Sequence, residues 1–522
     1  MAPQIASLGK LRHGITHERV ARLLPSSGPT ERRWVALLCL AASLRVLVYS
    51  AAFPFFDNVD EQHHYDLVVR YSHAQIPRKL EGFTSESARS IARYGSPEYI
   101  HAPSDYPGGA YPAPSWTLPA SVQTQRALRW ESTINFEAHA PPLYYGVAGT
   151  WLQLGKALAL PEVARLYWIR LLNVPLIAAV VWLAFATACA VFPANRSTRL
   201  AVPTLVAFIP QDTFYSIQSD VLSPLCFGAA FLGLLRLARA DAPSKQSGGA
   251  TGLAAACAGL VKTSNLPLVA LWGIALLLDA QRRLRAGTLR AAAPALGWAV
   301  ALAALPIIAW LAWNAIALGD FTGAASKAAV LGWTPKPLRE WWPHPLFTAS
   351  GARLFWTELT VSFWRGEFVW HRQPLAVPAA DAFYAVSSAM FPGLALLCLL
   401  RAGTVREAQR RALWLAFWSL LVSVAFLALL SIRFAFGETF YPSRQHPYLT
   451  SGRLLSGALI PFALLYAFGL ERAFAWTRRE WPRIAALAAV VALITLSEAI
   501  ANRAVFASEY NGFSLLAGSL RR

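Results

Sequence analysis

Charged residues are scarce in this chain of 522 residues. They make up 14% of the sequence, against roughly 25% in an average soluble chain, whereas hydrophobic residues make up 56%. A soluble fold of this size could not cover its surface with so few charges, so the composition excludes a disordered chain, an ordinary cytosolic enzyme and a nucleic-acid-binding domain. The net charge of +19 therefore bears on membrane orientation and not on a nucleic-acid partner.

Cysteines are also few, and the spacings typical of metal sites are missing. Neither HExxH nor CxxC occurs, and no internal repeat stands out. We expect the cysteines to act as small packing residues because each lies in an apolar run. They are Cys39, Cys189, Cys226, Cys257 and Cys398. The first thirty residues are polar and basic and the first apolar run is full length, so we expect a signal anchor and not a cleavable signal peptide.

Long apolar runs, in contrast, fill most of the chain, and its mean hydropathy is +0.40. A helix needs about 20 apolar residues to cross a hydrocarbon core roughly 30 Å thick. We expect an all-α polytopic membrane protein with about 11 transmembrane helices. The eleven runs are residues 34–55, 168–192, 200–216, 219–239, 250–265, 266–281, 292–316, 380–400, 412–432, 452–471 and 484–501. A twelfth and weaker run covers 141–160.

Basic residues predict the orientation of these spans, because cytoplasmic loops carry an excess of Lys and Arg. All the basic clusters fall on one side if segment 141–160 does not cross and instead skirts the outer leaflet. The clusters are Lys10/Arg12/Arg19/Arg22/Arg32/Arg33, Arg196/Arg199, Arg236/Arg239/Lys245, Arg282/Arg283/Arg285/Arg290, Arg401/Arg406/Arg410/Arg411 and Arg472/Arg478/Arg479/Arg483. The N-terminus is then inside and the C-terminus outside.

This topology divides the chain into four parts and places two large loops, with membrane-skirting helices, on the outer face. The parts are a cytoplasmic tail (1–33), a core module (34–316, with outer loop 57–167), a second outer loop (317–379) and C-terminal spans (380–522). The link that ends at Asp220 and the segment 433–450 also fall outside. We therefore expect the functional site on the outer face.

The sequence FPFFDNVDEQHHYD follows the first span directly and holds the adjacent carboxylates Asp60 and Glu61. One interpretation is a helix N-cap on a short amphipathic helix. A cap uses one acid, however, and Asp57 and Asp66 lie nearby with two histidines. As neighbours on a helix, His63 and His64 point to different faces, so they are weak metal ligands but plausible members of a substrate cleft.

These residues carry a resemblance to the GT-C superfamily of membrane glycosyltransferases. The chain is similar to the branch of protein O-mannosyltransferases and lipid A aminoarabinose transferases and to an uncharacterised bacterial group of predicted membrane proteins. The matching elements, in order, are VDEQHHYD with AQIP, EAHAPPLYY at 137–145 with His139, Arg170 at the head of a span, SIQSD with Asp220, Lys262-Thr263, and GRLLSGALIP with Arg453. The last element departs from the family pattern, because Leu454 replaces an aromatic residue.

The resemblance implies transfer of a sugar from a polyprenyl-phosphate donor to an acceptor hydroxyl on the outer face of the bacterial plasma membrane, in cell-envelope glycan or glycolipid synthesis. Asp60 would be the general base and Glu61 would orient it, which implies inversion at the anomeric carbon. Cations would stabilise the leaving phosphate, and Arg170, Lys262 and Arg453 are the candidates.

His64, His139 and Asp220 are the remaining candidate substrate-binding residues. Some relatives use a divalent metal and others do not. Asp60 with Asp220 could form such a site, although two carboxylates are few ligands for it.

The implied partners are the lipid-linked donor, a lipid, glycan or protein acceptor, and membrane lipids, with no nucleic acid. A transporter or flippase for lipid-linked saccharides is one alternative, although transporters commonly show inverted repeats. A polysaccharide polymerase or ligase is another.

Three further features allow a structural or a functional interpretation. Arg45 lies within the first span, where an unpaired charge costs about 2.5–3.5 kcal/mol, so we expect it to face protein or water, with a carboxylate, catalytic or structural, as a candidate partner. Glu498 in the last span is expected to be structural. The aromatic stretch 355–370 is typical of an interfacial helix, with Arg353, Arg365 and His371 near enough in sequence to approach a phosphate.

Overall fold

The structure is a computed structural model that describes residues 28–401, 403, 405–438, 441–477 and 479–515. The chain is an all-α polytopic membrane protein, as the sequence predicts. Nine helical stretches in the described part are long and apolar enough to cross a membrane. They are Pro29–Ala52, Glu162–Val191, Ser219–Arg239, Thr263–Arg285, Leu289–Leu318, Pro378–Leu400, Glu407–Arg433, Gly452–Ala473 and Trp481–Ala501. Most of the predicted tail 1–33 lies outside the described residues.

The α-helices in chain order are α2 (Pro29–Ala52), α3 (Glu61–Ser72), α4 (Ser85–Tyr94), α5 (Ala120–Glu131), α6 (Leu143–Ala157), α7 (Glu162–Leu171), α8 (Asn173–Val191), α9 (Arg196–Phe208), α10 (Ser223–Arg239), α11 (Lys245–Val261), α12 (Leu266–Arg285), α13 (Leu289–Leu318), α14 (Ala324–Val330), α15 (Ala349–Arg365), α16 (Pro378–Leu400), α17 (Glu407–Arg433), α18 (Leu459–Ala473) and α19 (Trp481–Ala501). The strands form two short antiparallel pairs, β1 (Thr334–Pro335) with β4 (Phe434–Ala435) and β2 (Val369–Trp370) with β3 (Gln373–Pro374).

Short 3-10 turns connect several of these helices. Those that bear on the site are η4 (Phe136–His139), η5 (Asp212–Tyr215), η6 (Ser219–Leu222), η7 (Thr263–Asn265) and η10 (Gly452–Ala458). The others are η1 (Pro103–Asp105), η2 (Pro107–Gly109), η3 (Ser115–Thr117), η8 (Leu338–Glu340), η9 (Pro345–Phe347) and η11 (Arg503–Ala507).

Two of the eleven predicted runs form helices shorter than a span, which corrects their predicted extent. Run 200–216 becomes α9, of 13 residues, which ends at Phe208 because the residue before Pro210 disfavours helical geometry. Run 250–265 becomes α11, of 17 residues, which ends where Lys262 takes an extended conformation. Both breaks put polar residues at the same end of the bundle.

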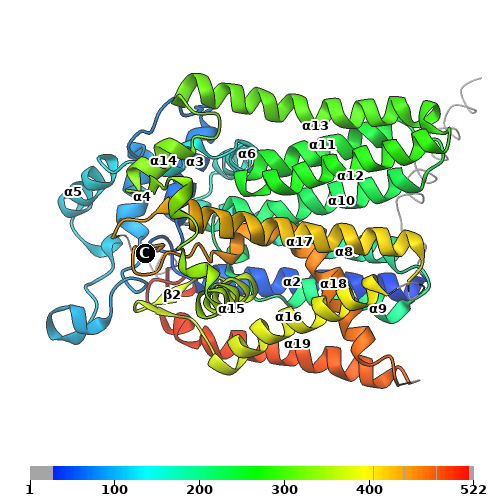
Figure 1. Cartoon of the computed structure of the whole chain (residues 1–522). Helices are drawn as coiled ribbons and strands as arrows, with labels where there is room; N and C mark the ends of the chain where they lie inside the picture. Colours follow the sequence, from blue (N-terminus) through cyan, green and yellow to red (C-terminus); the bar gives the residue numbers. More distant parts are fainter. Residues whose placement is uncertain (1–27, 402, 404, 439–440, 478, 516–522) are drawn as a thin grey trace, which may run out of the picture.

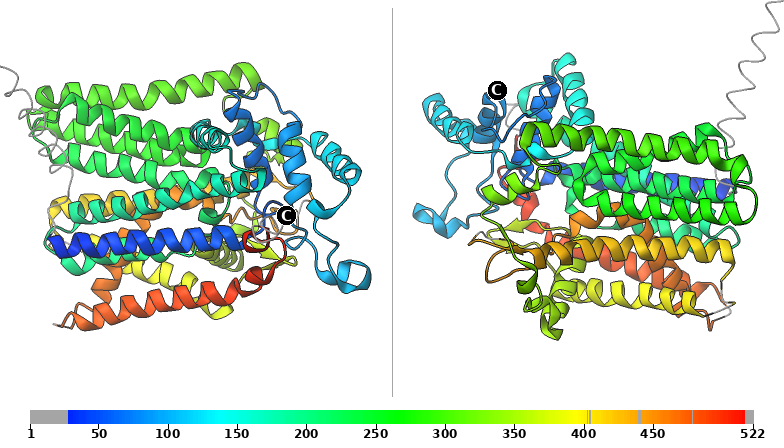
Figure 2. Two further views of the ribbon diagram at one scale, coloured as in Figure 1. Left: turned by 180° about the vertical axis from the view of Figure 1, so that it is seen from behind. Right: turned by 45° about the horizontal axis from the view of Figure 1, so that its top comes forward.

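All the long helices lie side by side in one bundle, with two chemically different ends (Figure 1). One end, here the loop end, holds residues 53–161, 319–377, 434–438 and 441–451. The opposite end holds the short links between α8 and α9, α10 and α11, α12 and α13, α16 and α17, and α18 and α19, which carry the described basic clusters (Figures 1 and 2). The helices therefore alternate in direction as the charge pattern requires.

Helix α6 occupies the weak run 141–160 and lies at the loop end (Figures 1 and 2). It packs against α3 through Gly149, where an added Cβ would lie 2.8 Å from the backbone nitrogen of Ser72. With 15 residues it is shorter than a span. The segment thus belongs to the first loop and not to the bundle.

Small residues and a central apolar helix hold the bundle together. Gly248 and Gly252 of α11 approach the backbone of α13 so closely that a Cβ would lie 2.0–2.1 Å from the carbonyl oxygens of Ala295 and Ala299, which is the close packing typical of membrane helices. Every residue from 459 to 470 of α18 is buried. Helix α18 is therefore the centre of the bundle, and it carries η10 at its loop end.

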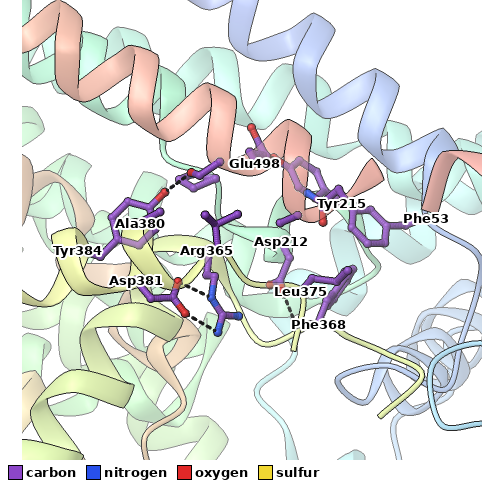
Figure 3. A pocket seen from close by; sticks show the side chains of 15 residues that line it. Phe53, Asp212, Tyr215, Arg365, Phe368, Leu375, Ala380, Asp381, Tyr384 and Glu498 are labelled. Carbon is purple, nitrogen blue, oxygen red and sulfur yellow. Dashed lines mark hydrogen bonds and ion pairs between the residues drawn. The ribbon is translucent and has the colours of Figure 1, made fainter. Parts of the chain in front are cut away.

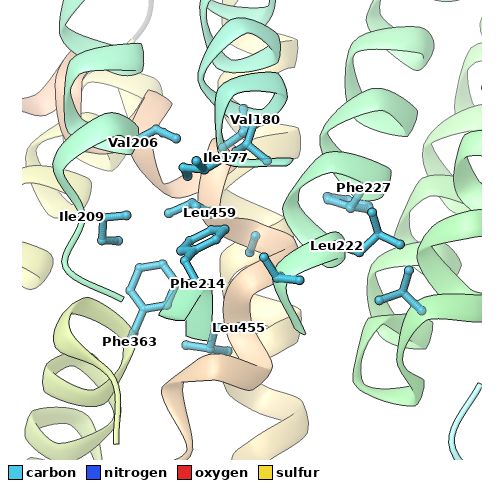
Figure 4. Packing of buried hydrophobic residues seen from close by; sticks show 14 of the residues in the cluster. Ile177, Val180, Val206, Ile209, Phe214, Leu222, Phe227, Phe363, Leu455 and Leu459 are labelled. Carbon is cyan, nitrogen blue, oxygen red and sulfur yellow. The ribbon is translucent and has the colours of Figure 1, made fainter. Parts of the chain in front are cut away.

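A buried apolar cluster fixes the turns that lead into the site (Figure 4). Phe214 of η5 lies among Ile177 and Val180 of α8 and Leu455 and Leu459 of η10 and α18. This packing holds residues 209–222 under the loop end. Within the spans, the partner of Arg45 is Glu498 of α19, at 3.3 Å.

Candidate functional site

The turn between α2 and α3 is strained. Phe56, Asp57, Val59 and Asp60 have φ values of 64°, 59°, 47° and 65°, a region that non-glycine residues seldom adopt and that is least favourable for a β-branched side chain. Such strain persists only where surrounding contacts impose it, and it is common at functional sites. The contacts that impose it here come from three distant parts of the chain.

Asp60 occupies the N-cap position of α3, but within the described helix its carboxylate makes no capping hydrogen bond. The carboxylate instead accepts a hydrogen bond from Arg453 of η10, with 2.9 Å between Oδ2 and Nη2. The side chain keeps 32% of its surface exposed. Burial is the largest single effect and raises the pKa of Asp60, but the charges of Arg453, Lys327 and His63 together outweigh it, so the net pKa is lowered. Asp60 is thus an ionised and accessible carboxylate.

Arg453 also binds the strained turn itself. Its Nη1 donates to the carbonyl oxygen of Val59 at 3.1 Å, and its Nε lies 3.7 Å from the carboxylate of Glu367 in the second loop. Glu367 in turn accepts a hydrogen bond from Ser451. Arg453 is therefore shared between one carboxylate from each loop.

Glu61 and Arg170 form a buried pair next to this turn, with 2% and 1% of their side chains exposed. Arg170 donates to both carboxylate oxygens, at 2.8 and 2.6 Å. Its remaining N–H groups donate to the carbonyl oxygens of Ser50, Phe53 and Pro54. All five N–H donors of Arg170 are thus occupied, and in this arrangement none points to a phosphate.

Two further ion pairs lie at the loop end. Lys262, between α11 and η7, binds Asp220 of η6, and Lys327 of α14 binds Glu137 of η4. Asp220 is fully buried, and its Oδ1 has no hydrogen-bond partner among the described residues. The charges of Glu137 and Lys327 are close enough to act on the pKa of Asp60.

We call these residues the ionic cluster. It consists of the carboxylates Asp60, Glu137, Asp220 and Glu367 and the cations Lys262, Lys327 and Arg453. Each cation is paired with a carboxylate. In the described part of the chain no three His, Cys, Asp or Glu residues are grouped as a metal site would need, and Asp60 and Asp220 are each bound to a cation.

The two histidines of the predicted site are neutral at ordinary pH. Burial lowers the pKa of His64 to about 3 and that of His139 to about 4. His64 Nδ1 lies 2.7 Å from the hydroxyl of Tyr145, and His139 Nδ1 lies 2.9 Å from the carbonyl oxygen of Phe136. They offer hydrogen-bonding nitrogens and no charge.

The aromatic stretch 355–370 forms most of α15 and the segment that places Glu367. Asp212 accepts hydrogen bonds from the backbone nitrogens of Glu367 and Phe368, both at 2.6 Å. Gly366 has a φ of 88°, and a Cβ there would overlap the Asp212 carboxylate. Figure 3 shows the hydrogen bond between Asp212 and Phe368 beside a cavity of about 20 Å³, the space of about one water molecule.

Arg365, a candidate from the sequence, forms a forked ion pair with Asp381 in the same view (Figure 3), with distances of 3.0 and 3.3 Å. His371 lies at the tip of the β2–β3 hairpin, where its backbone nitrogen donates to the carbonyl oxygen of Glu98. Both residues thus have structural contacts outside the ionic cluster.

The structure therefore brings together Asp60, Asp220, Lys262 and Arg453 of the predicted site, with His64 and His139 beside them. It adds three residues that the sequence reasoning missed, namely Glu137, Lys327 and Glu367. Glu137 is the acid of the EAHAPPLYY element and could have been found there. Lys327 and Glu367 lie in the second loop, where no local pattern distinguishes them.

The family model described as "Predicted membrane protein (DUF2142)" matches residues 44–439. No curated protein matches the sequence. Among solved structures, the chain is similar to the crystal structure of the Archaeoglobus fulgidus oligosaccharyltransferase in the apo form, with 12% sequence identity and a TM-score of 0.42. That alignment covers 93% of this chain and 57% of the other, so the chain spans little more than half the length of that protein.

Proposed function

The chain belongs to the DUF2142 family of predicted membrane proteins, and from its ionic cluster we propose that it is a glycosyltransferase. It moves a sugar from a polyprenyl-phosphate donor to an acceptor hydroxyl, on the outer face of the plasma membrane. The observation that carries the proposal is the state of Asp60, an ionised, partly exposed carboxylate held by Arg453 at the loop end. The resemblance of the VDEQHHYD element to the GT-C pattern supports it.

Asp60 acts as the general base. As the acceptor oxygen attacks the anomeric carbon, its proton passes to a carboxylate oxygen of Asp60, and the bond from the anomeric carbon to the phosphate oxygen breaks. The polyprenyl phosphate leaves with the bonding electron pair. One displacement on one face of the sugar inverts the anomeric centre.

The leaving phosphate gains negative charge, which preorganised cations stabilise. Arg453 and Lys262 fit this role because each is partly exposed, with 13% and 15% of the side chain accessible. Lys327 joins them as a third cation. Since each is paired with a carboxylate in the absence of donor, the phosphate must share or displace those carboxylates.

Glu61 and Arg170 position the base and do not contact the donor. Glu61 accepts hydrogen bonds from the backbone nitrogens of Phe56 and Ile217 in addition to those from Arg170. These bonds fix the start of α3 and hence the Asp60 backbone. This reassigns Arg170 from phosphate binding to positioning, because its donors are all occupied.

The experiment is sugar transfer by the purified protein in nanodiscs, with a panel of polyprenyl-phosphate sugars and the anomeric configuration of the product read by NMR. Asp60→Asn keeps the size of the side chain but cannot take the proton, so transfer should fall at least about 100-fold. Asp105→Asn is the matched control, because Asp105 binds Arg372 on the exposed side of the same loop.

Full activity of Asp60→Asn would contradict the base assignment. Retention of the anomeric configuration would contradict single displacement. If the wild-type protein moves the lipid-linked sugar across the bilayer without transferring it, the chain is a flippase and the proposal fails.

A further inference from the structure

A second polar feature of the loop end lies outside the ionic cluster. It is an open groove of about 470 Å³ formed by segments 332–345, 434–437 and 444–447, which we call the basic groove. The segments follow the ends of α13 and α17, so the groove lies beyond the spans. Its volume falls in the range of roughly 300–1,000 Å³ typical of small-ligand sites.

Backbone hydrogen bonds fix the walls of the groove. β1 pairs with β4, and the backbone nitrogen of Lys336 extends this ladder by donating to the Arg433 carbonyl oxygen at 2.8 Å. His344 Nε2 bonds to the carbonyl oxygen of Pro447 at 3.1 Å, which ties the first segment to the third. The groove is thus a built surface and not a gap between loose loops.

The charges in the groove differ from those in the ionic cluster. Lys336 and Arg444 line it, and in the described part of the chain neither side chain lies within 4.0 Å of a carboxylate, although the charge of Glu340 in the same groove acts on Lys336. Lys262, Lys327 and Arg453, in contrast, are all paired. Two unpaired cations in one groove form a ready site for an anionic group, because charge-assisted hydrogen bonds to Lys and Arg are among the strongest available.

The other lining groups narrow the ligand class. Pro343, Pro345 and Phe434 give apolar faces that suit the C–H faces of a sugar ring, and the Glu340 carboxylate accepts hydrogen bonds from hydroxyls. A polyhydroxylated ligand that carries a negative group satisfies the whole lining.

We propose that the basic groove binds an anionic saccharide unit, one that bears a carboxylate or a phosphate, and that this unit belongs to the acceptor. The assignment of this unit to the acceptor rests on the proposed transfer function, whereas binding of an anionic saccharide in the groove does not. The wall segment 444–447 continues to Ser451, which donates a hydrogen bond to Glu367 of the ionic cluster, and then to Arg453 of the same cluster. The groove and the cluster are therefore joined by one short piece of chain.

The test is binding of glucose 1-phosphate, with glucose as the neutral control, to the full-length protein in phosphatidylcholine nanodiscs by calorimetry. The wild type should bind glucose 1-phosphate at least about tenfold more tightly than glucose. The double variant Lys336→Gln/Arg444→Gln should lose at least about tenfold, the loss expected for charge-assisted hydrogen bonds. Arg339→Gln is the matched control, because Arg339 is 86% exposed in the same segment and does not line the groove.

Asp60→Asn separates the two proposals, because it should abolish transfer and leave this binding unchanged. The groove proposal is overturned if the double variant binds glucose 1-phosphate as tightly as the wild type does. It is also overturned if the wild type binds glucose as tightly as glucose 1-phosphate. Loss of binding in phosphatidylglycerol nanodiscs would assign the groove to lipid headgroups and also overturn it. A thermal unfolding curve of the double variant that matches the wild type confirms that any loss is local; Arg444 is exposed and Lys336 is half-buried.

Discussion

The Glu61–Arg170 pair allows a sharp test of the positioning role, through the variant Glu61→Gln. In the wild type Oε1 accepts from Arg170 Nε and the Ile217 nitrogen, and Oε2 accepts from Arg170 Nη2 and the Phe56 nitrogen. A glutamine has one acceptor oxygen and one NH₂ group. Whichever way the amide turns, two donors then face its NH₂ group and Arg170 keeps an uncompensated charge.

Breaking a buried pair by removing one partner costs about 3–5 kcal/mol, and the near-complete burial of both groups places this pair in that class. The measurement is the unfolding free energy of detergent-purified protein, from denaturant titration followed by tryptophan fluorescence. Glu407→Gln is the matched control. It breaks the Arg411–Glu407 pair, whose side chains keep 50% and 64% of their surface exposed, and should cost about 1 kcal/mol or less.

Glu61→Asp keeps the charge and should therefore recover part of the unfolding free energy that Glu61→Gln loses. A Glu61→Asp variant no more stable than Glu61→Gln would show that the shorter side chain outweighs the retained charge. The reasoning is refuted if the unfolding free energy of Glu61→Gln stays within about 1 kcal/mol of the wild type.

Three further predictions concern the cluster and the topology. The charge of Arg453 lowers the pKa of Asp60 against the effect of burial, so Arg453→Gln should raise that pKa. The acid limb of the pH–rate profile should then move to higher pH, and an unmoved limb would contradict Asp60 as the titrating base. Lys327→Met should raise the KM for the polyprenyl-phosphate donor about tenfold or more, whereas Lys336→Met should leave donor KM unchanged; equal effects would remove Lys327 from the donor site. Cysteines placed at Ser104 and Ser326 should react with an impermeant reagent in intact cells, and protection of either until lysis would show that the loop end does not face outward.

The sequence predicts the bundle well because each span is an apolar run whose limits follow from local chemistry. Its errors at α9 and α11 arise because each predicted run continues past the residue where the helix ends, beside Pro210 or at Lys262, into a few polar residues that a long hydropathy window averages out. Hydropathy alone does not register these breaks. The alternation of direction follows from the basic links and needs no tertiary information.

The candidate site is predicted only in part, because its contacts join residues far apart in the chain. Asp60 is found from its place after the first span. Its partner Arg453 is 393 residues away and lies in an element that departs from the family pattern. The role of Arg170 is not readable from sequence, since an arginine that could bind phosphate and one saturated by carbonyl oxygens have the same local surroundings.

The wide separation of the contacts around the strained turn has a consequence for biosynthesis. The turn leaves the ribosome with the first span, whereas Arg453, which holds both Val59 and Asp60, arrives at the head of the penultimate span, α18. A chain interrupted before that point keeps the Glu61–Arg170 contacts at the start of α3 but lacks the hydrogen bonds from Arg453 to Val59 and Asp60. Under the proposed function, catalytic competence is therefore acquired late, in the final stage of membrane insertion, and an unfinished chain should not consume the lipid-linked sugar.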